Sequence, residues 1–326
     1  MIKLRVAVVH GGRSGEHEIS LRSAKAVLDH IDRQRFEPVP VFIDKQGKWH
    51  PGHICPEPGG NPGIDVVFPV LHGTFGEDGT IQGLFEMAGL PYVGAGVFAS
   101  SAAMDKEHFK RLCADRGLPI CEYAVQPASA LDPDAAIARL GLPVFVKPAN
   151  LGSSVGIAKA HNREELAAAL ADAARYDTKV IIERSIAGQE LECAVLGNHQ
   201  PAAATPCEIL PSKEFYDYED KYLLDKARTL IPPNLTAQQI EEVRRLAVAC
   251  YLAVECSGMG RVDFLVEKAT GQIYINEINT IPGFTSISMF PKMWEHDGVG
   301  FTALISRLID LALERHAQRQ ALRFEL

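Results

Sequence analysis

The sequence lacks the features of several common protein classes. It has no CxxC pair and an odd number of cysteines, seven, so neither a disulfide framework nor a zinc ribbon is expected. No apolar run reaches membrane-spanning length, and the N-terminus has no signal-peptide pattern. Positive charge is scarce, since the formal net charge is −8, which disfavours nucleic acid or a membrane as the main partner. These absences predict a cytoplasmic protein with reduced cysteines.

Two nucleotide-binding signatures are also missing. The chain has neither a GxGxxG fingerprint nor a Walker loop ending in GKS or GKT. A nicotinamide dehydrogenase, one alternative for an N-terminal α/β unit, is therefore disfavoured. Any phosphate that the protein binds must be held by another pattern of residues.

The composition is that of a globular protein, with 47% apolar residues in a chain of 326, enough for two or three compact units. Strand and helix periodicities alternate over the first part of the chain, which predicts a parallel sheet with crossover helices. The expected units are 1–103, 104–186 and 187–326, and the predicted fold class is α/β.

The most informative pattern is RVD followed by EIN near the C-terminus. Both motifs lie in runs typical of strands, and the turn signal EKATGQ between them predicts an antiparallel hairpin. If the turn centres near Thr270, Asp263 lies opposite Glu277 on one face. With Asn279 they offer only oxygen ligands, which Mg²⁺ prefers. A solvated acidic face is the alternative, but Arg261 beside the acids favours a magnesium site.

A glycine-serine loop, LGSSVG at 151–156, lies between two predicted strands. Its backbone N–H groups and serine hydroxyls are suited to bind anionic oxygens. Lys147 is the charged residue of the preceding apolar strand, and a buried lysine needs an anion partner. A plain hairpin turn is the alternative, but Lys147 favours a phosphate-binding loop.

Three weaker signals remain open between function and structure. Glu183 and Glu190 are placed where they could accept hydrogen bonds from an adenine amino group or ribose hydroxyls, or face water. Glu16 and Glu18 lie at a helix start, where they favour a bound ammonium or merely provide the usual acidity of a first turn. His72 ends a strand, where open α/β sheets bind ligands, but its own loop could equally satisfy it.

Long motifs along nearly the whole chain carry a family resemblance. They are VVHGGRSGEHEISLRSA, LHGTFGEDGTIQGL, YVGAGVFASSAAMDK, VKPANLGSSVGI, EFYDYEDKY, GMGRVDF and INEINTIPGFTSISMFPKMW. Together they closely resemble the D-alanine–D-alanine ligases, ATP-grasp enzymes of peptidoglycan precursor synthesis in cell wall biogenesis. The resemblance implies an ATP-grasp fold behind an N-terminal Rossmann-like unit. It also implies ligation of two D-alanines through D-alanyl phosphate, with release of ADP and phosphate.

The resemblance further implies roles for individual residues. The residues expected to bind ATP are Lys106, Lys147, Ser153, Ser154, Glu183, Ile186 and Glu190. Two Mg²⁺ or Mn²⁺ ions are expected at Asp263, Glu277 and Asn279, with Glu277 as the bridge, and a monovalent cation is a further expectation. The residues expected around the first D-alanine and the tetrahedral intermediate are Glu16, His72, Ser153, Tyr222, Arg261 and Gly283. Those expected around the second D-alanine are Lys221, Ser288 and Met289.

An acyl phosphate hydrolyses if water reaches it, so a lid is expected, and the aromatic, charged tract EFYDYEDKYLLD suits one. A ligase that joins D-alanine to D-lactate or D-serine is a close alternative, against which Tyr222 argues. A protein that keeps the fold without catalysis is disfavoured by the intact set of Arg261 and the metal ligands. The resemblance also implies a homodimer.

Overall fold

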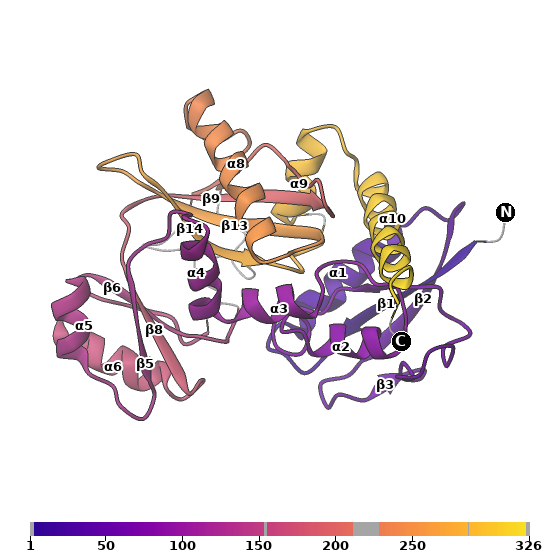
Figure 1. Cartoon of the computed structure of the whole chain (residues 1–326), viewed down its shortest axis with the longest axis horizontal. Coiled ribbons are helices and arrows are strands. Elements are labelled where there is room, and N and C mark those ends of the chain that lie inside the picture. The colour runs from indigo at the N-terminus through magenta and orange to yellow at the C-terminus, as the bar shows by residue number, and fades with distance from the viewer. Residues whose placement is uncertain (1–2, 153–154, 211–227, 286, 324–326) are drawn as a thin grey trace.

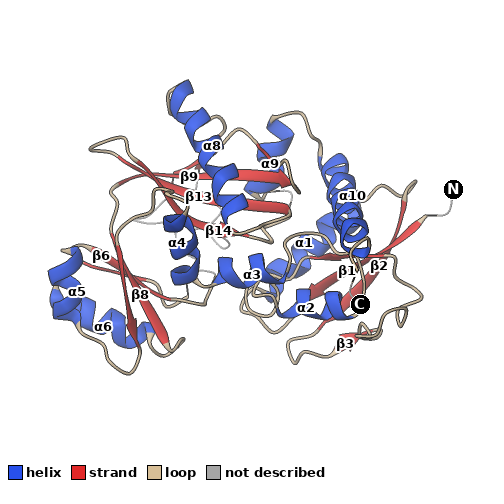
Figure 2. Cartoon of the chain, viewed as in Figure 1, coloured by secondary structure: helices blue, strands red, loops and turns tan. Residues whose placement is uncertain are grey.

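The computed structural model describes residues 3–152, 155–210, 228–285 and 287–323. These residues form three β-sheets with helices packed against them (Figure 1, Figure 2). The α/β fold predicted from the sequence is confirmed. No helix among the described residues is long and apolar enough to cross a membrane.

The N-terminal part contains a four-stranded sheet in the order β3-β2-β1-β4. Its elements are β1 (Leu4–Gly11), α1 (His17–His30), β2 (Phe36–Ile43), β3 (Trp49–His50), β4 (Val66–Pro69), α2 (Thr80–Met87) and α3 (Val97–Met104). β1 runs parallel to both β2 and β4, as the sequence predicts. β4 is buried along its whole length, which is typical of strands in a parallel sheet covered on both faces.

The connection between β2 and β4 contains a short strand that the sequence analysis did not predict. The chain turns back at Asp44 and forms β3, which pairs antiparallel with β2. The Asp44 carboxylate accepts hydrogen bonds from the backbone N–H groups of Gln46 and Lys48, both at 2.9 Å. This local turn chemistry favours a hairpin, which the hydrophobic periodicity did not reveal.

The central part contains an antiparallel sheet in the order β5-β8-β6-β7. Its elements are α4 (Lys106–Asp115), β5 (Tyr123–Pro127), α5 (Pro133–Leu140), β6 (Val144–Pro148), β7 (Ala158–Ala160), α6 (Arg163–Ala173) and β8 (Lys179–Arg184). Helices α5 and α6 lie together on one side of this sheet (Figure 2). β6 and β7 are paired antiparallel neighbours, so the prediction that LGSSVG connects two strands rather than opening a helix is confirmed.

The C-terminal part contains a six-stranded sheet with the main order β12-β11-β9-β13-β14, and β10 pairs with β9. Its elements are β9 (Gly188–Gly197), β10 (Ala202–Ala203), β11 (Cys207–Leu210), β12 (Arg228–Leu230), α8 (Ala237–Ala253), β13 (Gly258–Glu267), β14 (Ile273–Asn279), α9 (Met289–His296) and α10 (Phe301–Gln320). The capping box of Thr236 and Gln239 begins α8. The sequence analysis did not predict the short elements β12 and α9.

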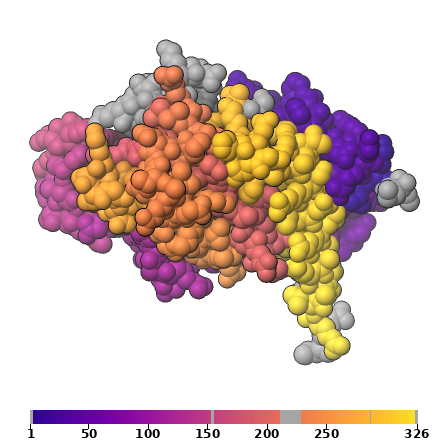
Figure 3. Space-filling view, turned by 90° about the horizontal axis from the view of Figure 1, so that it is seen from above, coloured from indigo at the N-terminus to yellow at the C-terminus, as the bar shows by residue number. Residues whose placement is uncertain are grey.

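The N-terminal and C-terminal parts share one hydrophobic core. Phe68 of β4 meets Phe284 with ring centroids 5.7 Å apart, and Leu308 of α10 belongs to the same buried cluster. Figure 3 shows α10 lying against the N-terminal part. The central sheet has a separate core that includes Val146 and Leu166. Apolar packing therefore joins the first and last parts of the chain more closely than either joins the central sheet.

Arg315 of α10 adds a polar connection between the N-terminal and C-terminal parts. Its guanidinium donates hydrogen bonds to the carbonyl oxygens of Tyr92 (3.0 Å) and Gly94 and to the Ser257 hydroxyl (2.6 Å). It also lies 4.3 Å from the centroid of the Tyr92 ring, a distance that favours a cation–π interaction. One side chain thus connects the end of the N-terminal part to the start of β13.

We expect Arg315→Met to lower the free energy of unfolding by about 2 kcal/mol, because several hydrogen bonds from a charged donor are lost together. Urea denaturation measures the change. The matched control is Arg319→Met, one turn later. The Arg319 side chain is 57% exposed and lies 3.2 Å from Glu86, so this ion pair should contribute less than about 1 kcal/mol. Equal losses in the two variants would contradict the role of Arg315.

Candidate active site

A cavity of about 610 Å³ lies where the three parts of the chain meet. The predicted site residues that line it are Glu16, His72, Lys106, Arg261, Glu277, Asn279, Gly283, Ser288 and Met289. The predicted residues Ser153, Ser154, Lys221 and Tyr222 lie outside the described residues. The fold therefore brings together side chains that are far apart in the sequence.

The hairpin of β13 and β14 has the register that the sequence predicts. Asp263 is paired with Glu277, and Arg261 with Asn279. The register shifts directly after Asp263, so the paired positions that carry these side chains end at a bulge. Bulges are common next to functional sites because they redirect the strand.

Arg261 contacts two acidic side chains, Asp263 on its own strand and Glu192 on the neighbouring strand β9. Its guanidinium donates two hydrogen bonds of 2.7 Å to the Asp263 carboxylate and lies 3.2 Å from Glu192 Oε2. The Asn279 amide also donates to Asp263, at 3.1 Å. The sequence analysis missed Glu192, although it alternates with Glu190 on β9 and is paired with Asp263 in the sheet.

The donor set at this hairpin fits a hard divalent cation. Asp263, Glu277 and Asn279 offer carboxylate and amide oxygens and no sulfur or imidazole. With Glu192, the pairing of β9, β13 and β14 brings three carboxylates and one guanidinium to this part of the sheet. The bidentate pair with Arg261 occupies Asp263, so a cation bound by Asp263 would have to compete with that guanidinium.

Lys106 reaches the cavity from the start of α4. Its backbone N–H donates to the carbonyl oxygen of Ala149 (3.0 Å), and its ammonium donates to that of Leu151 (2.6 Å). Burial lowers the pKa of Lys106. The first lysine of α4 therefore contacts the start of the glycine-serine loop, which is consistent with a shared anionic ligand.

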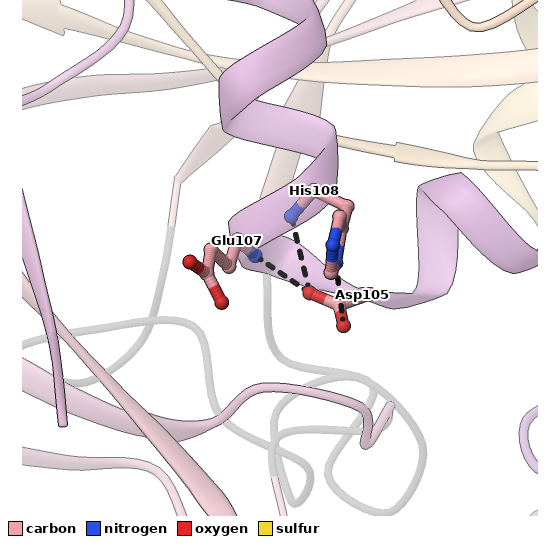
Figure 4. Close-up of side chains that lie close together, drawn as sticks. All are labelled: Asp105, Glu107 and His108. Carbon is pink, nitrogen blue, oxygen red and sulfur yellow. Dashed lines mark hydrogen bonds and ion pairs between the residues drawn. The ribbon is translucent and has the colours of Figure 1, made fainter. Parts of the chain in front are cut away.

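Asp105, Glu107 and His108 gather at the N-terminus of α4 (Figure 4). The Asp105 carboxylate accepts hydrogen bonds from the backbone N–H groups of Glu107 and His108, which is N-capping. The ammonium of Lys179 lies 2.7 Å from both Asp105 and Glu107. Because Lys179 and Arg111 already form ion pairs with these two acids, we interpret the cluster as an anchor of α4 to β8 and not as a metal site.

Lys147 has the anion partner that its burial demands, and the partner is Glu183. The Lys147 ammonium lies 2.6 Å from Glu183 Oε2, and the fully buried Lys110 of α4 lies 3.0 Å from Oε1. Burial opposes ionisation, but the two ammonium groups lower the pKa of Glu183 to about 2. The sequence analysis missed Lys110, which differs from an ordinary helix lysine only in its spacing of four from Lys106.

The two remaining residues predicted to contact ATP lie after β8. Ile186 is buried between β8 and β9, and Glu190 is half-buried on β9 next to β13. Neither lines the cavity of about 610 Å³. Their proximity to the Glu183 end of β8 is consistent with a nucleotide-base subsite beside the cavity.

Glu16 is buried at the start of α1, against the loop that follows β4. A side chain at Gly73 would place its Cβ only 2.5 Å from Glu16 Oε2, and Gly73 has a φ of +73°. Both facts explain why glycine occupies this position. Ser14 adds a second contact between the start of α1 and this loop, because its hydroxyl donates a hydrogen bond to the carbonyl oxygen of His72 (2.7 Å).

His72 and Glu77 form the buried wall behind Glu16. Burial lowers the pKa of His72, so its ring is neutral: Nδ1 donates to the Ile281 carbonyl oxygen (3.0 Å) and Nε2 accepts from Ser23 (2.9 Å). Burial and the nearby Glu16 carboxylate raise the pKa of Glu77 to about 8. The sequence analysis missed Glu77, which accepts hydrogen bonds from the N–H groups of Gly73 and Ile281.

The turn after β14 brings Gly283 against Ser288, the N-cap residue of α9. A Cβ at Gly283 would lie 2.9 Å from Ser288 Oγ, so a larger residue would displace that hydroxyl. Ser288 Oγ also accepts a hydrogen bond from the backbone N–H of Thr285 (3.0 Å). Met289 follows at the start of α9, with its sulfur 3.6 Å from Cys207 Sγ.

Comparisons with known proteins agree with this arrangement. The family model described as "D-ala D-ala ligase C-terminus" matches residues 112–310, and that described as "D-ala D-ala ligase N-terminus" matches residues 5–60 and 57–95. A curated "D-alanine--D-alanine ligase" from Solibacter usitatus is 62% identical over 326 residues, which cover 99% of both chains. One from Heliobacterium modesticaldum is 47% identical, covering 98% of this chain and 97% of the relative.

Solved structures give the same result at lower identity. The D-alanine-D-alanine ligase from Coxiella burnetii superposes with a TM-score of 0.86 at 34% identity, covering 98% of this chain and 96% of that one. The VanG D-Ala:D-Ser ligase from Enterococcus faecalis also gives a TM-score of 0.86, at 35% identity, covering 95% of this chain and all of that one. The overall fold alone therefore does not separate these two specificities.

The ion pairs of Glu183 predict a pH-dependent stability. Its folded pKa of about 2 lies below the usual 4.5, so its stabilisation is present above pH 4.5 and is lost as the pH falls towards 2. Glu183→Gln should therefore lower the free energy of unfolding by about 3 kcal/mol at neutral pH, and less in acid.

Urea denaturation of wild type and Glu183→Gln at a series of pH values measures this difference. A difference that stays constant down to about pH 3 would contradict an ionised, buried Glu183. Glu242→Gln is the control, because its ion pair with Arg245 is exposed and should contribute little at any pH.

Proposed function

Because the chain belongs to the D-alanine–D-alanine ligase family, we infer that it joins two molecules of D-alanine to D-alanyl-D-alanine with ATP. It is an ATP-grasp ligase, and its reaction supplies peptidoglycan synthesis in the cell wall. The observation that carries this inference is the family match over nearly the whole chain together with the meeting of Glu16, Lys106 and the β13–β14 hairpin at one cavity.

The phosphates of ATP are proposed to lie beside Lys106 and Lys147, under the glycine-serine loop with Ser153 and Ser154. The contact of Lys106 with Leu151 supports this placement, because it already joins a cation to that loop. Adenine and ribose are proposed to contact Glu183, Ile186 and Glu190. The position of Glu183 near the end of β8, three residues before Ile186, supports this placement.

Asp263, Glu277 and Asn279 are proposed to hold two Mg²⁺ or Mn²⁺ ions, and a monovalent cation is proposed in addition. Divalent cations at this position would neutralise phosphate oxygens during transfer to a carboxylate. Arg261 and the backbone N–H of Gly283 are proposed to stabilise the tetrahedral oxyanion. The strong hydrogen bonds between Arg261 and Asp263 support this role, since they fix the guanidinium before substrate arrives.

Glu16 is proposed to bind the ammonium of the first D-alanine, near His72. A buried carboxylate attracts such a cation more strongly than a solvated one does. Ser153 and Tyr222 are proposed to connect the loop and the lid to Glu16. The second D-alanine is proposed to bind Lys221, Ser288 and Met289, and its deprotonated amine attacks the acyl phosphate and expels phosphate.

A D-alanine–D-lactate or D-alanine–D-serine ligase is the alternative within the fold. The similarity to a D-Ala:D-Ser ligase is the observation behind the D-alanine–D-serine alternative. The 62% identical relative, however, is a D-alanine–D-alanine ligase by name. We also propose that the protein is a cytoplasmic homodimer. Within each chain, unit 1–103 is proposed to contribute the first substrate site and unit 104–186 the nucleotide site. Unit 187–326 is proposed to contribute the metal site and the lid.

A single assay tests the function. Purified protein with Mg²⁺, ATP and equal D-alanine, D-lactate and D-serine at pH 7 should give almost only D-alanyl-D-alanine, with ADP and phosphate. Mass spectrometry identifies the products. AMP as the nucleotide product would refute the acyl-phosphate route, and D-alanyl-D-lactate or D-alanyl-D-serine as the main product would favour the alternative.

The metal assignment predicts the effect of Glu277→Gln. Losing a charge shared by two cations should reduce ligation by about a thousandfold and weaken Mn²⁺ binding by about a hundredfold, as measured by electron paramagnetic resonance. Asp263→Asn should be milder, because it is expected to contact one ion. Glu295→Gln, on the exposed side of α9, is the control, and Mn²⁺ binding equal to that control in Glu277→Gln would refute the bridge.

A further inference from the structure

Lys110 is a fully buried charge to which the proposed reaction assigns no role. It projects from α4 four residues after Lys106, so both lysines lie on one face of that helix. Lys106 lines the cavity, whereas Lys110 is 0% exposed and contacts Glu183 Oε1 at 3.0 Å. A buried ammonium is costly without a partner. The contact with Glu183 explains how the fold tolerates the Lys110 charge, but it does not explain what that charge does.

The buried group formed by Lys110, Lys147 and Glu183 carries an excess of positive charge. Two ammonium groups share one carboxylate, each held by a different oxygen. The remaining close polar neighbour of Lys110 is the thiol of Cys121, 3.6 Å away, and burial raises the pKa of Cys121, so this thiol is neutral. The net charge of the group is therefore +1.

We propose that Lys110 is a positioning residue for ATP, because it neutralises Glu183 and thereby leaves the charge of Lys147 available to the nucleotide phosphates. The proposal rests on the proposed ATP-dependent function. Without Lys110, the 2.6 Å contact between Lys147 and Glu183 becomes a closed, neutral pair. Lys110 also contacts Oε1 of Glu183. This contact orients the carboxylate so that Oε2 lies against the Lys147 ammonium.

The test is to compare the affinities for ATP and for adenosine, which lacks the phosphates. Both dissociation constants can be measured by calorimetry without D-alanine. In Lys110→Met the preference for ATP over adenosine should fall by about tenfold or more, because one charge is lost near the phosphates. The dissociation constant for adenosine should change by less than about threefold. An unchanged preference, or equal weakening of both ligands, would overturn the proposal.

Two further variants separate charge from structure. Glu183→Gln raises the net charge of the buried group to two positive charges, and the preference for ATP should rise. Lys110→Met combined with Glu183→Gln restores a single positive charge on Lys147, and the preference should return close to the wild-type value. This double variant buries no carboxylate and carries the test if Lys110→Met alone fails to fold. A preference about tenfold below wild type in the double variant would also overturn the proposal.

Phe109→Leu is the matched control for damage to α4. Phe109 precedes Lys110 but packs in the core below α8, among residues that include Val243 and Phe264. It should lower stability without changing the preference for ATP. Failure of the proposed function looks different: wild-type protein would then bind no ATP at all, whereas failure of this proposal leaves a wild type that binds ATP and an unaltered preference in Lys110→Met.

Discussion

The buried, ionised carboxylate of Glu183 is the constraint on which the central-sheet side of the site depends. It lies between the ammonium groups of Lys110 and Lys147, at 3.0 and 2.6 Å, and losing this carboxylate would leave two buried ammonium groups without it. The three residues belong to α4, β6 and β8. The same electrostatic requirement therefore fixes how α4 sits on the central sheet, and α4 carries Lys106 to the cavity.

The β13–β14 hairpin applies the same principle with the opposite sign. There the guanidinium of Arg261 is shared by Asp263 and Glu192, and Glu277 adds a further acid. The carboxylates on this side would favour divalent cations, while the ammonium groups beside Glu183 would favour phosphates. A ligand made of phosphates and metal ions would lie between the two sides and would contact both.

The sequence predicted those parts of the site that depend on local periodicity. Asp263 faces Glu277 because side chains alternate along strands and the turn position follows from EKATGQ. Lys147 was expected to need an anion, but its partner Glu183 is 36 residues away and no local pattern identifies it. Lys110 and Glu192 were missed for the same reason, since only packing between elements reveals that they are buried. Strand β3 and helix α9 were missed because they are too short for periodicity to detect.

The distribution of the cores determines which part of the molecule can move. Phe68, Phe284 and α10 join the N-terminal and C-terminal parts in one cluster, while the central sheet packs around Val146 and Leu166 in a cluster of its own. Rotation of the central sheet would therefore break fewer apolar contacts than separation of the other two parts. Because Glu183 and Lys147 lie on that sheet and Glu277 does not, such a rotation would change the distance from Glu277 to these two residues. A ligand bound between the central sheet and the β13–β14 hairpin would oppose this rotation.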